Sequence, residues 1–204
     1  MTGKSHMTIG LVTYASLWVQ PLGPFHAPLL GGSRSLLAVP VALAIVAFGS
    51  LLPDIDHPDS SLANEKVIGL PIFLPFAWVI GKIFGHRGVT HSLLAVAGLI
   101  ALGKVSQLPW EALNLDWLRA AGEALRYVWT DLNLGWLIVW GYAWHMAADA
   151  LTRSGIPLFW PLPARFGIPP VRRLRFTTDT WPEYLYVTAL AIACIGNALR
   201  RWQF

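Results

Sequence analysis

Histidine and aspartate residues recur in a few short segments of this chain. The stretches "LLPDIDHPDS", "GHRGVTHS" and "WHMAADA" each hold at least two of them, and His6 and Glu183 stand near the two ends. Imidazoles and carboxylates without thiolates suit zinc or manganese in a hydrolytic site, where a bridging aspartate can hold two ions about 3.5–4 Å apart. The candidate metal ligands are His6, Asp54, Asp56, His57, His86, His91, His145, Asp149 and Glu183.

The spacing within these segments favours shared ligation. His145 and Asp149 are i and i+4, so on a helix both side chains point to one face. Asp54 and Asp56 are i and i+2, and an irregular turn can aim both to the same side. Either aspartate can then be a ligand while the other orients a water molecule or takes its proton.

The composition is that of an integral membrane protein. The 204 residues are 55% hydrophobic and only 13% charged, with a mean hydropathy of +0.52. A net charge of +4 in so apolar a chain suits anionic lipid headgroups better than nucleic acid. Cys194 is the single cysteine, so an intramolecular disulfide is excluded and a cysteine metal site is disfavoured. We expect one domain over residues 1–204.

Hydropathy predicts an all-α, polytopic membrane helical bundle. The five expected spans, all short against about 20 residues for a comfortable crossing, cover residues 7–22, 36–52, 90–108, 132–148 and 184–199. Residues 67–84 contain two prolines and a lysine, and residues 109–131 mix tryptophan with charged residues. Both stretches are therefore expected to lie at the membrane interface rather than to cross it.

Five crossings would bring the candidate ligands to one face of the membrane. The N-terminus, the loop between spans two and three and the loop between spans four and five then share a side, with only His26 of the six histidines opposite. The basic residues on this side are Lys4, Lys66, Lys82, Arg87, Arg153, Arg165, Arg172, Arg173 and Arg175; those on the other are Arg34, Lys104, Arg119, Arg126, Arg200 and Arg201. We expect a multi-pass inner (plasma) membrane protein. The positive-inside rule predicts that its site faces the cytoplasm.

Three segments also carry a family resemblance. The stretches "LLPDIDHPDS", "GHRGVTHSLL" and "HMAADALTRSGIPLFWP" resemble the signature blocks of the YdjM-type membrane-bound metal-dependent hydrolases, and the resemblance extends over nearly the whole chain. That family is distantly similar to the zinc-dependent phospholipase C and single-strand nuclease superfamily, whose ligands run in the order His, Asp, His, His-x-x-x-Asp, Glu. The resemblance implies phosphoester hydrolysis at two or three zinc ions, with manganese as the alternative metal.

Position by position, the resemblance implies as ligands His6, Asp54 or Asp56, His86, His91, His145, Asp149 and Glu183, with Asp149 as the bridge. The soluble superfamily has further histidines between the His-x-x-x-Asp motif and the final Glu, and this chain has none after His145. We therefore expect two metal ions, and a third only if His57 or both His86 and His91 supply the missing ligands.

Arginines near the candidate ligands can bind a phosphate. Arg87 is a candidate catalytic and substrate-binding residue and Arg153 a candidate substrate-binding residue, because a guanidinium holds a phosphate bidentately. The remaining run of Arg165, Arg172, Arg173 and Arg175 is expected to attract lipid headgroups. A site at the ends of short spans can take its substrate from the bilayer. A phospholipid or polyprenyl-type phosphate or diphosphate is therefore favoured over a soluble nucleotide.

A different class of protein can use the same residues. The His-Glu-x-x-His motif of metalloproteases and the Gly-x-Ser-x-Gly motif of serine hydrolases are absent. A metal transporter or sensor remains the alternative, but such proteins bind their ions near the bilayer midplane on interrupted helices. The ligands here gather at the ends of the expected spans, which favours the hydrolase.

Overall fold

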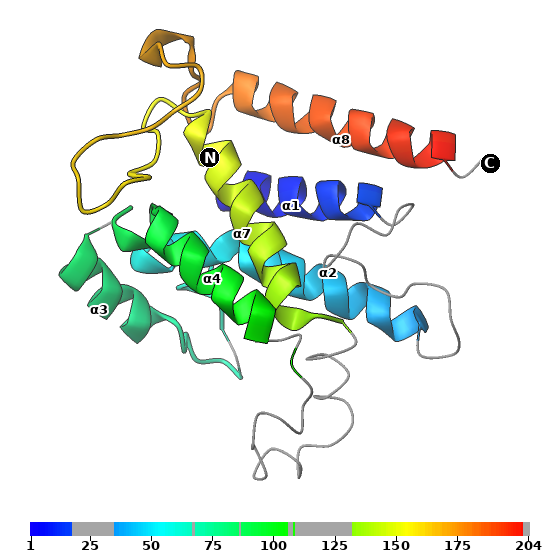
Figure 1. The fold of residues 1–204 in the computed structure, drawn as a ribbon, viewed down its shortest axis with the longest axis horizontal. Helices are drawn as coiled ribbons and strands as arrows, with labels where there is room; N and C mark the ends of the chain where they lie inside the picture. The colour runs from blue at the N-terminus through cyan, green and yellow to red at the C-terminus, as the bar shows by residue number, and fades with distance from the viewer. Residues whose placement is uncertain (18–34, 67, 86, 106–107, 109–131, 202–204) are drawn as a thin grey trace.

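Apolar runs of the sequence form the helices of the structure, a computed structural model that describes residues 1–17, 35–66, 68–85, 87–105, 108 and 132–201. The α-helices are α1 (Gly3–Leu17), α2 (Ser35–Leu51), α3 (Leu74–Phe84), α4 (Leu93–Val105), α7 (Leu134–Ala150) and α8 (Trp181–Arg201), and the short 3-10 turns are η2 (Leu52–Asp56), η3 (Val89–His91) and η6 (Arg172–Leu174) (Figure 1). The described residues contain no β-strand, and two isolated bridges lie in the loop after α7. The all-α fold class is confirmed over these residues.

Helix α7 is the centre of the bundle. It packs against α1, α2 and α4, while α8 lies along α1 (Figure 1). Buried apolar side chains from α1, α2 and α7, among them Tyr14, Val46 and Leu137, form a core between these three helices. The inner face of α7 therefore contacts segments that are far away in the chain.

Two glycines allow α2 and α7 to approach closely. A Cβ atom at Gly141 of α7 would lie 2.2 Å from the Val46 carbonyl oxygen, and one at Gly49 of α2 would lie 2.6 Å from the Ile138 carbonyl oxygen. Both contacts are with backbone, which cannot move aside as a flexible side chain can. The absence of a side chain at these two positions therefore sets the spacing of the two helices.

The loop of residues 151–180 runs from α7 to α8. Backbone bridges pair Thr152 with Phe176 and Ile156 with Phe166. The buried Arg175 guanidinium donates to the backbone carbonyls of Gly167, Pro169 and Pro170. These bonds give the loop a defined path beside the C-terminal end of α7.

The structure supports the expected five-span arrangement only in part. Two stretches of the described chain, Val39–Asp56 and Trp181–Arg200, are long and apolar enough to cross a membrane. The helices α1, α4 and α7 have 15, 13 and 17 residues, fewer than a comfortable crossing requires. Of the expected interfacial stretches, residues 74–84 form α3, which exposes large apolar side chains such as Phe76 and Ile83. Residues 109–131 lie outside the described residues.

Candidate metal site

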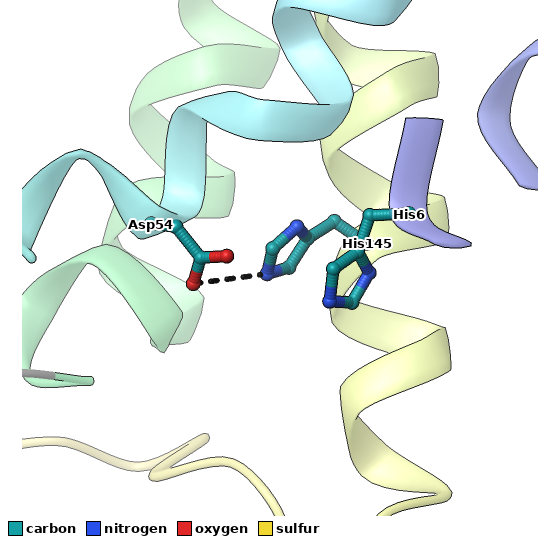
Figure 2. A group of neighbouring side chains, drawn as sticks. All are labelled: His6, Asp54 and His145. Carbon is teal, nitrogen blue, oxygen red and sulfur yellow. Dashed lines mark ion pairs between the residues drawn. The ribbon is translucent and has the colours of Figure 1, made fainter. Parts of the chain in front are cut away.

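Five ionisable side chains converge where α1, η2, η3 and α7 meet. They are His6, Asp54, His91, His145 and Asp149, here called the His/Asp cluster, and they form two overlapping groups whose nitrogen and oxygen atoms lie within 4.8 Å of one another. Figure 2 shows His6, Asp54 and His145 coming together from separate elements. All but Asp54 have fully buried side chains, and the Asp54 side chain is 20% exposed.

Distances within the His/Asp cluster suit ligands of a common cation. Asp54 Oδ1 lies 3.5 Å from His91 Nε2 and 3.6 Å from His145 Nε2, and Asp149 Oδ2 lies 3.7 Å from His91 Nε2. These separations exceed the usual hydrogen-bond range. Two ligands at about 2 Å from a tetrahedral zinc ion are themselves about 3.3 Å apart. The spacing therefore fits coordination better than direct hydrogen bonding.

His145 points a lone pair at the carboxylates. Its Nδ1 lies 2.7 Å from the Ser50 carbonyl oxygen, which only accepts, so Nδ1 carries the proton and donates. In the neutral ring Nε2 is then an acceptor, and it faces Asp54 Oδ1 at 3.6 Å and Asp149 Oδ2 at 4.0 Å with no hydrogen-bond partner among the described residues. Acceptors that face one another in a buried site need a cation between them. These nitrogen and oxygen atoms therefore fit as ligands of a divalent metal.

The two oxygens of Asp149 face different histidines. Oδ1 lies 3.2 Å from His6 Nε2 and 2.7 Å from the Met1 ammonium, whereas Oδ2 faces His91 and His145. Burial raises the pKa of the Asp149 carboxyl, but the interaction with His6 and the positive charge of the ammonium outweigh burial and hold this pKa well below its usual range. Asp149 is therefore ionised at neutral pH and placed as a bridging carboxylate would be.

Asp56 lies behind the cluster rather than in it. Its Oδ2 accepts hydrogen bonds from the Arg87 backbone amide at 2.8 Å and from the Thr90 hydroxyl, and it is 3.9 Å from His91 Nδ1. The 3-10 turn η2 turns Asp54 toward His145 and buries Asp56 on the side of residues 87–91. Asp56 thus supports His91 and its loop, while Asp54 is the aspartate of this turn that faces the other ligands.

Arg87 is held beside the cluster by three contacts. Its Nη2 pairs with Asp149 Oδ2 at 2.9 Å, its Nη1 donates to the Ser154 hydroxyl, and its backbone amide bonds to Asp56. The backbone of Arg87 has φ 56°, a left-handed conformation that non-glycine residues rarely adopt. Its side chain is 15% exposed, so a guanidinium lies at the solvent edge of the His/Asp cluster.

Several predicted site residues lie elsewhere. His57 Nδ1 accepts a hydrogen bond from the Asp59 backbone amide, and His57 belongs to neither ligand group. Glu183 is also in neither group, because its two oxygens accept the backbone amides of Thr2 and Asp179 and so connect the starts of α1 and α8. Arg153 is an exposed residue of the loop after α7. His86 lies outside the described residues.

Sequence reasoning missed the groups that orient these side chains. The Ser50 carbonyl orients His145, Thr90 bonds to Asp56, and Ser154 bonds to Arg87. Tyr142, one helical turn before His145, donates to the Thr90 carbonyl. The i, i−3 spacing of Tyr142 and His145 is a signal that sequence analysis can use, but a backbone carbonyl carries no sequence signal.

An apolar cavity lies next to these orienting groups. It has a volume of about 280 Å³ and is lined by residues that include Leu52, Ile55, Val89, Thr90 and Tyr142. Nearby on α4, Leu93 and Leu94 are 47% and 57% exposed. The surface beside Thr90 and Tyr142 is therefore apolar.

Comparison with known proteins adds a family assignment. A family model described as "YdjM inner membrane protein" matches residues 1–203. The "Inner membrane protein YdjM" of Escherichia coli (strain K12) is 39% identical over 125 residues, which cover 58% of this chain and 48% of that protein, and the protein of the same name from Shigella flexneri gives the same values. This chain thus matches about half the length of these two relatives.

A second kind of relative aligns over most of both chains. The "Uncharacterized protein YvsG" of Bacillus subtilis (strain 168) is 27% identical over 193 residues, which cover 95% of this chain and 91% of that protein. No solved structure matches this chain.

Proposed function

This chain belongs to the YdjM inner membrane protein family, and from that premise we propose that it is a metal-dependent hydrolase that cleaves a phosphoester or diphosphate bond of a lipid phosphate. The observation that carries the proposal is the His145 Nε2 lone pair facing the carboxylates of Asp54 and Asp149 in a buried site. A divalent ion held there would supply water activation at neutral pH and neutralise charge on the reacting phosphate.

The metal is proposed to be zinc, or manganese, in two copies. His6 faces one oxygen of Asp149, and His91 and His145 face the other, which supports Asp149 as the bridge. Asp54 completes the ligand set with Oδ1 between His91 and His145. All five ligands are imidazole or carboxylate groups, which suit both metals.

The chain's own residues have separable roles in this proposal. Asp54 is the most exposed member of the cluster and meets substrate and water first, so its second oxygen can orient the attacking water. Arg87 presents a partly exposed guanidinium beside Asp149 and binds a phosphate oxygen. Asp56 positions His91 and the backbone of Arg87. We assign it a positioning role in place of the catalytic or ligand role considered from the sequence.

A lipid substrate is supported by the surroundings of the site. The apolar cavity beside Thr90 and Tyr142 can take part of an acyl or prenyl chain while the phosphate lies at the His/Asp cluster. The exposed apolar side chains Leu93 and Leu94 of α4, the helix that also lines this cavity, support its access to lipids. The distribution of basic residues favours a site on the cytoplasmic side, and we carry that orientation as part of the proposal.

The test measures metal content and hydrolysis on the same preparations. The detergent-purified wild type is compared with Asp149→Ala and with His57→Ala, a histidine control outside the cluster, by plasma mass spectrometry and by release of phosphate from phosphatidic acid and polyprenyl diphosphate. We expect two equivalents of metal and phosphate release in the wild type and in His57→Ala, and loss of both in Asp149→Ala. Metal binding with transport of zinc into liposomes, and no phosphate release from either substrate, would show a transporter instead. A protein that binds no metal after metal-replete purification contradicts the proposal.

A further inference from the structure

A second cavity opens beside the His/Asp cluster and is lined almost wholly by arginine. It has a volume of about 540 Å³ and is lined by Arg153, Ser154, Arg165, Arg172 and Arg175, here called the arginine cavity. Its size is within the usual range for small-molecule sites. Within the described part of the chain, none of these four guanidinium groups forms an ion pair with a carboxylate.

The arginines are held by backbone contacts that leave donors available. Arg153 Nε donates to the Arg175 carbonyl at 3.3 Å, Arg172 Nε donates to the Arg153 carbonyl at 3.1 Å, and Arg165 Nη1 donates to the Ser154 carbonyl at 3.4 Å. Both terminal nitrogens of Arg153 and Arg172 therefore have no acceptor among the described residues. A guanidinium held at Nε presents these two nitrogens as a planar fork, the geometry that recognises phosphate bidentately.

Arg175 has a different part in the cavity. Its guanidinium is buried and bonds to three backbone carbonyls of the loop at residues 167–170. Among the described residues, its positive charge is thus balanced by carbonyl dipoles. Four like charges around one cavity repel one another, and the repulsion falls when an anion lies between them.

The arginine cavity is connected to the metal site through one residue. Ser154 lines the cavity, and its hydroxyl accepts a hydrogen bond from Arg87, whose other terminal nitrogen pairs with Asp149. Ser154 therefore contacts both the arginine cavity and the arginine that is proposed to bind the substrate phosphate. The same loop also exposes the apolar side chains of Leu162, Phe166 and Leu174, which suits a position of the loop at a lipid surface.

We propose that the arginine cavity binds a phosphate-type oxyanion through Arg153, Arg165 and Arg172, and that it holds the anionic group of the substrate that is not cleaved. The substrate class is then a molecule with two phosphate groups, such as a diphosphate or a phosphorylated phospholipid. The substrate role rests on the proposed hydrolase function, whereas oxyanion binding does not.

The experiment titrates inorganic phosphate into the full-length, metal-replete protein in detergent by calorimetry. Arg153→Gln and Arg172→Gln each remove a fork, and Arg172→Lys keeps the charge without the fork. The matched control is Arg173→Gln, because Arg173 is the exposed neighbour of Arg172 and does not line the cavity. We expect the Kd for phosphate to rise at least about tenfold in both glutamine variants, less in Arg172→Lys, and under about twofold in Arg173→Gln. Metal content should be the same in all of them.

The outcomes separate this inference from the hydrolase proposal. Equal weakening by Arg172→Gln and Arg173→Gln, or no phosphate binding by the wild type, would overturn the arginine cavity as an anion site even if metal and hydrolysis are found. Phosphate binding that follows the expected pattern in a protein without hydrolysis would support the site and reject only the proposed reaction. The source of the anion is identified in nanodiscs of phosphatidylcholine with added phosphatidic acid. If the phosphatidic acid competes with inorganic phosphate for the cavity, the anion is a lipid headgroup. If it does not compete, the anion belongs to a soluble phosphoester.

Discussion

The two nitrogens of His145 have separate tasks, and each can be tested at the residue scale. Nδ1 donates to the Ser50 carbonyl, which holds α7 against α2, and Nε2 faces Asp54 and Asp149. A ligand histidine with its second nitrogen bonded to a carbonyl is a common arrangement in metal sites. The residue therefore contributes to both helix packing and ligation.

Replacing His145 with asparagine should separate these tasks. In His145→Asn the amide nitrogen can still donate to the Ser50 carbonyl, but nothing reaches the position of Nε2. We expect a melting temperature within a few degrees of the metal-free wild type and loss of bound metal by plasma mass spectrometry. Retention of the full metal content in this variant would mean that Nε2 is not a ligand.

The two aspartates of η2 should respond differently to the loss of charge. Asp54→Asn removes a carboxylate that faces two histidines, so we expect a lower metal stoichiometry. Asp56→Asn weakens the support of His91 and Arg87 without removing a ligand, so we expect unchanged stoichiometry and an affinity reduced about 10–100-fold. Competition with a zinc chelator measures both values. The reverse pattern would make Asp56 the ligand.

At the scale of elements, the crossing of α2 and α7 determines where the ligands meet. Asp54 follows the end of α2, and His145 and Asp149 occupy the last turns of α7. The Ser50 carbonyl bonded to His145 lies one residue after Gly49, which is one of the two close contacts between these helices. A small increase in helix spacing would therefore separate the ligands.

Gly141→Ala tests this dependence on helix spacing. The new methyl group would lie 2.2 Å from the Val46 carbonyl oxygen, so the helices must move apart. We expect destabilisation of about 1–3 kcal/mol together with weaker metal binding. Gly196→Ala in α8 is the control, because no atom lies within 4 Å of the added carbon, and it should be neutral or stabilising by up to about 1 kcal/mol. Equal thermal stability of the two variants would argue against a spacing role for Gly141.

At the scale of the whole molecule, α8 has less contact with the rest of the protein than the other candidate span, residues 39–56, has. Only 6% of its Trp181–Arg200 window is buried inside the protein, against 33% for Val39–Asp56. Tyr186, Val187 and Leu190 pack toward α1, whereas Ile192, Ile195 and Leu199 are exposed. Such an apolar outer face is stable only in contact with lipid or another protein.

A spin label at position 192 measures this environment. In a Cys194→Ser background, Ile192→Cys allows labelling of one site in liposomes, because Cys194 is the only native cysteine. We expect the label to be more accessible to oxygen than to a water-soluble nickel chelate. A label introduced by Asp59→Cys, at an exposed residue of the loop after η2, should show the opposite preference. Preferential contact of the nickel chelate with position 192 would place α8 outside the bilayer.

The sequence by itself determined the membrane character, the helical class and most of the candidate ligands. Long apolar runs bounded by proline, glycine and charged residues leave few alternatives to helices, and the i, i+4 spacing of His145 and Asp149 places both on one face of any helix. These inferences depend on local composition and periodicity, which a sequence states directly. Bound metal and catalysis remain predictions.

Only the tertiary structure decided which carboxylates join the histidines. An i, i+2 pair in a turn can point to either side, and it is the packing of η2 beside α7 and η3 that directs Asp54 toward His145 and Asp56 toward Thr90. Glu183 faces the amides of Thr2 and Asp179 because α8 begins beside the start of α1. The structure also brought the arginines of the loop of residues 151–180 around one cavity beside Ser154. These arrangements depend on contacts between segments that are far apart in the chain, and local sequence patterns do not predict such contacts.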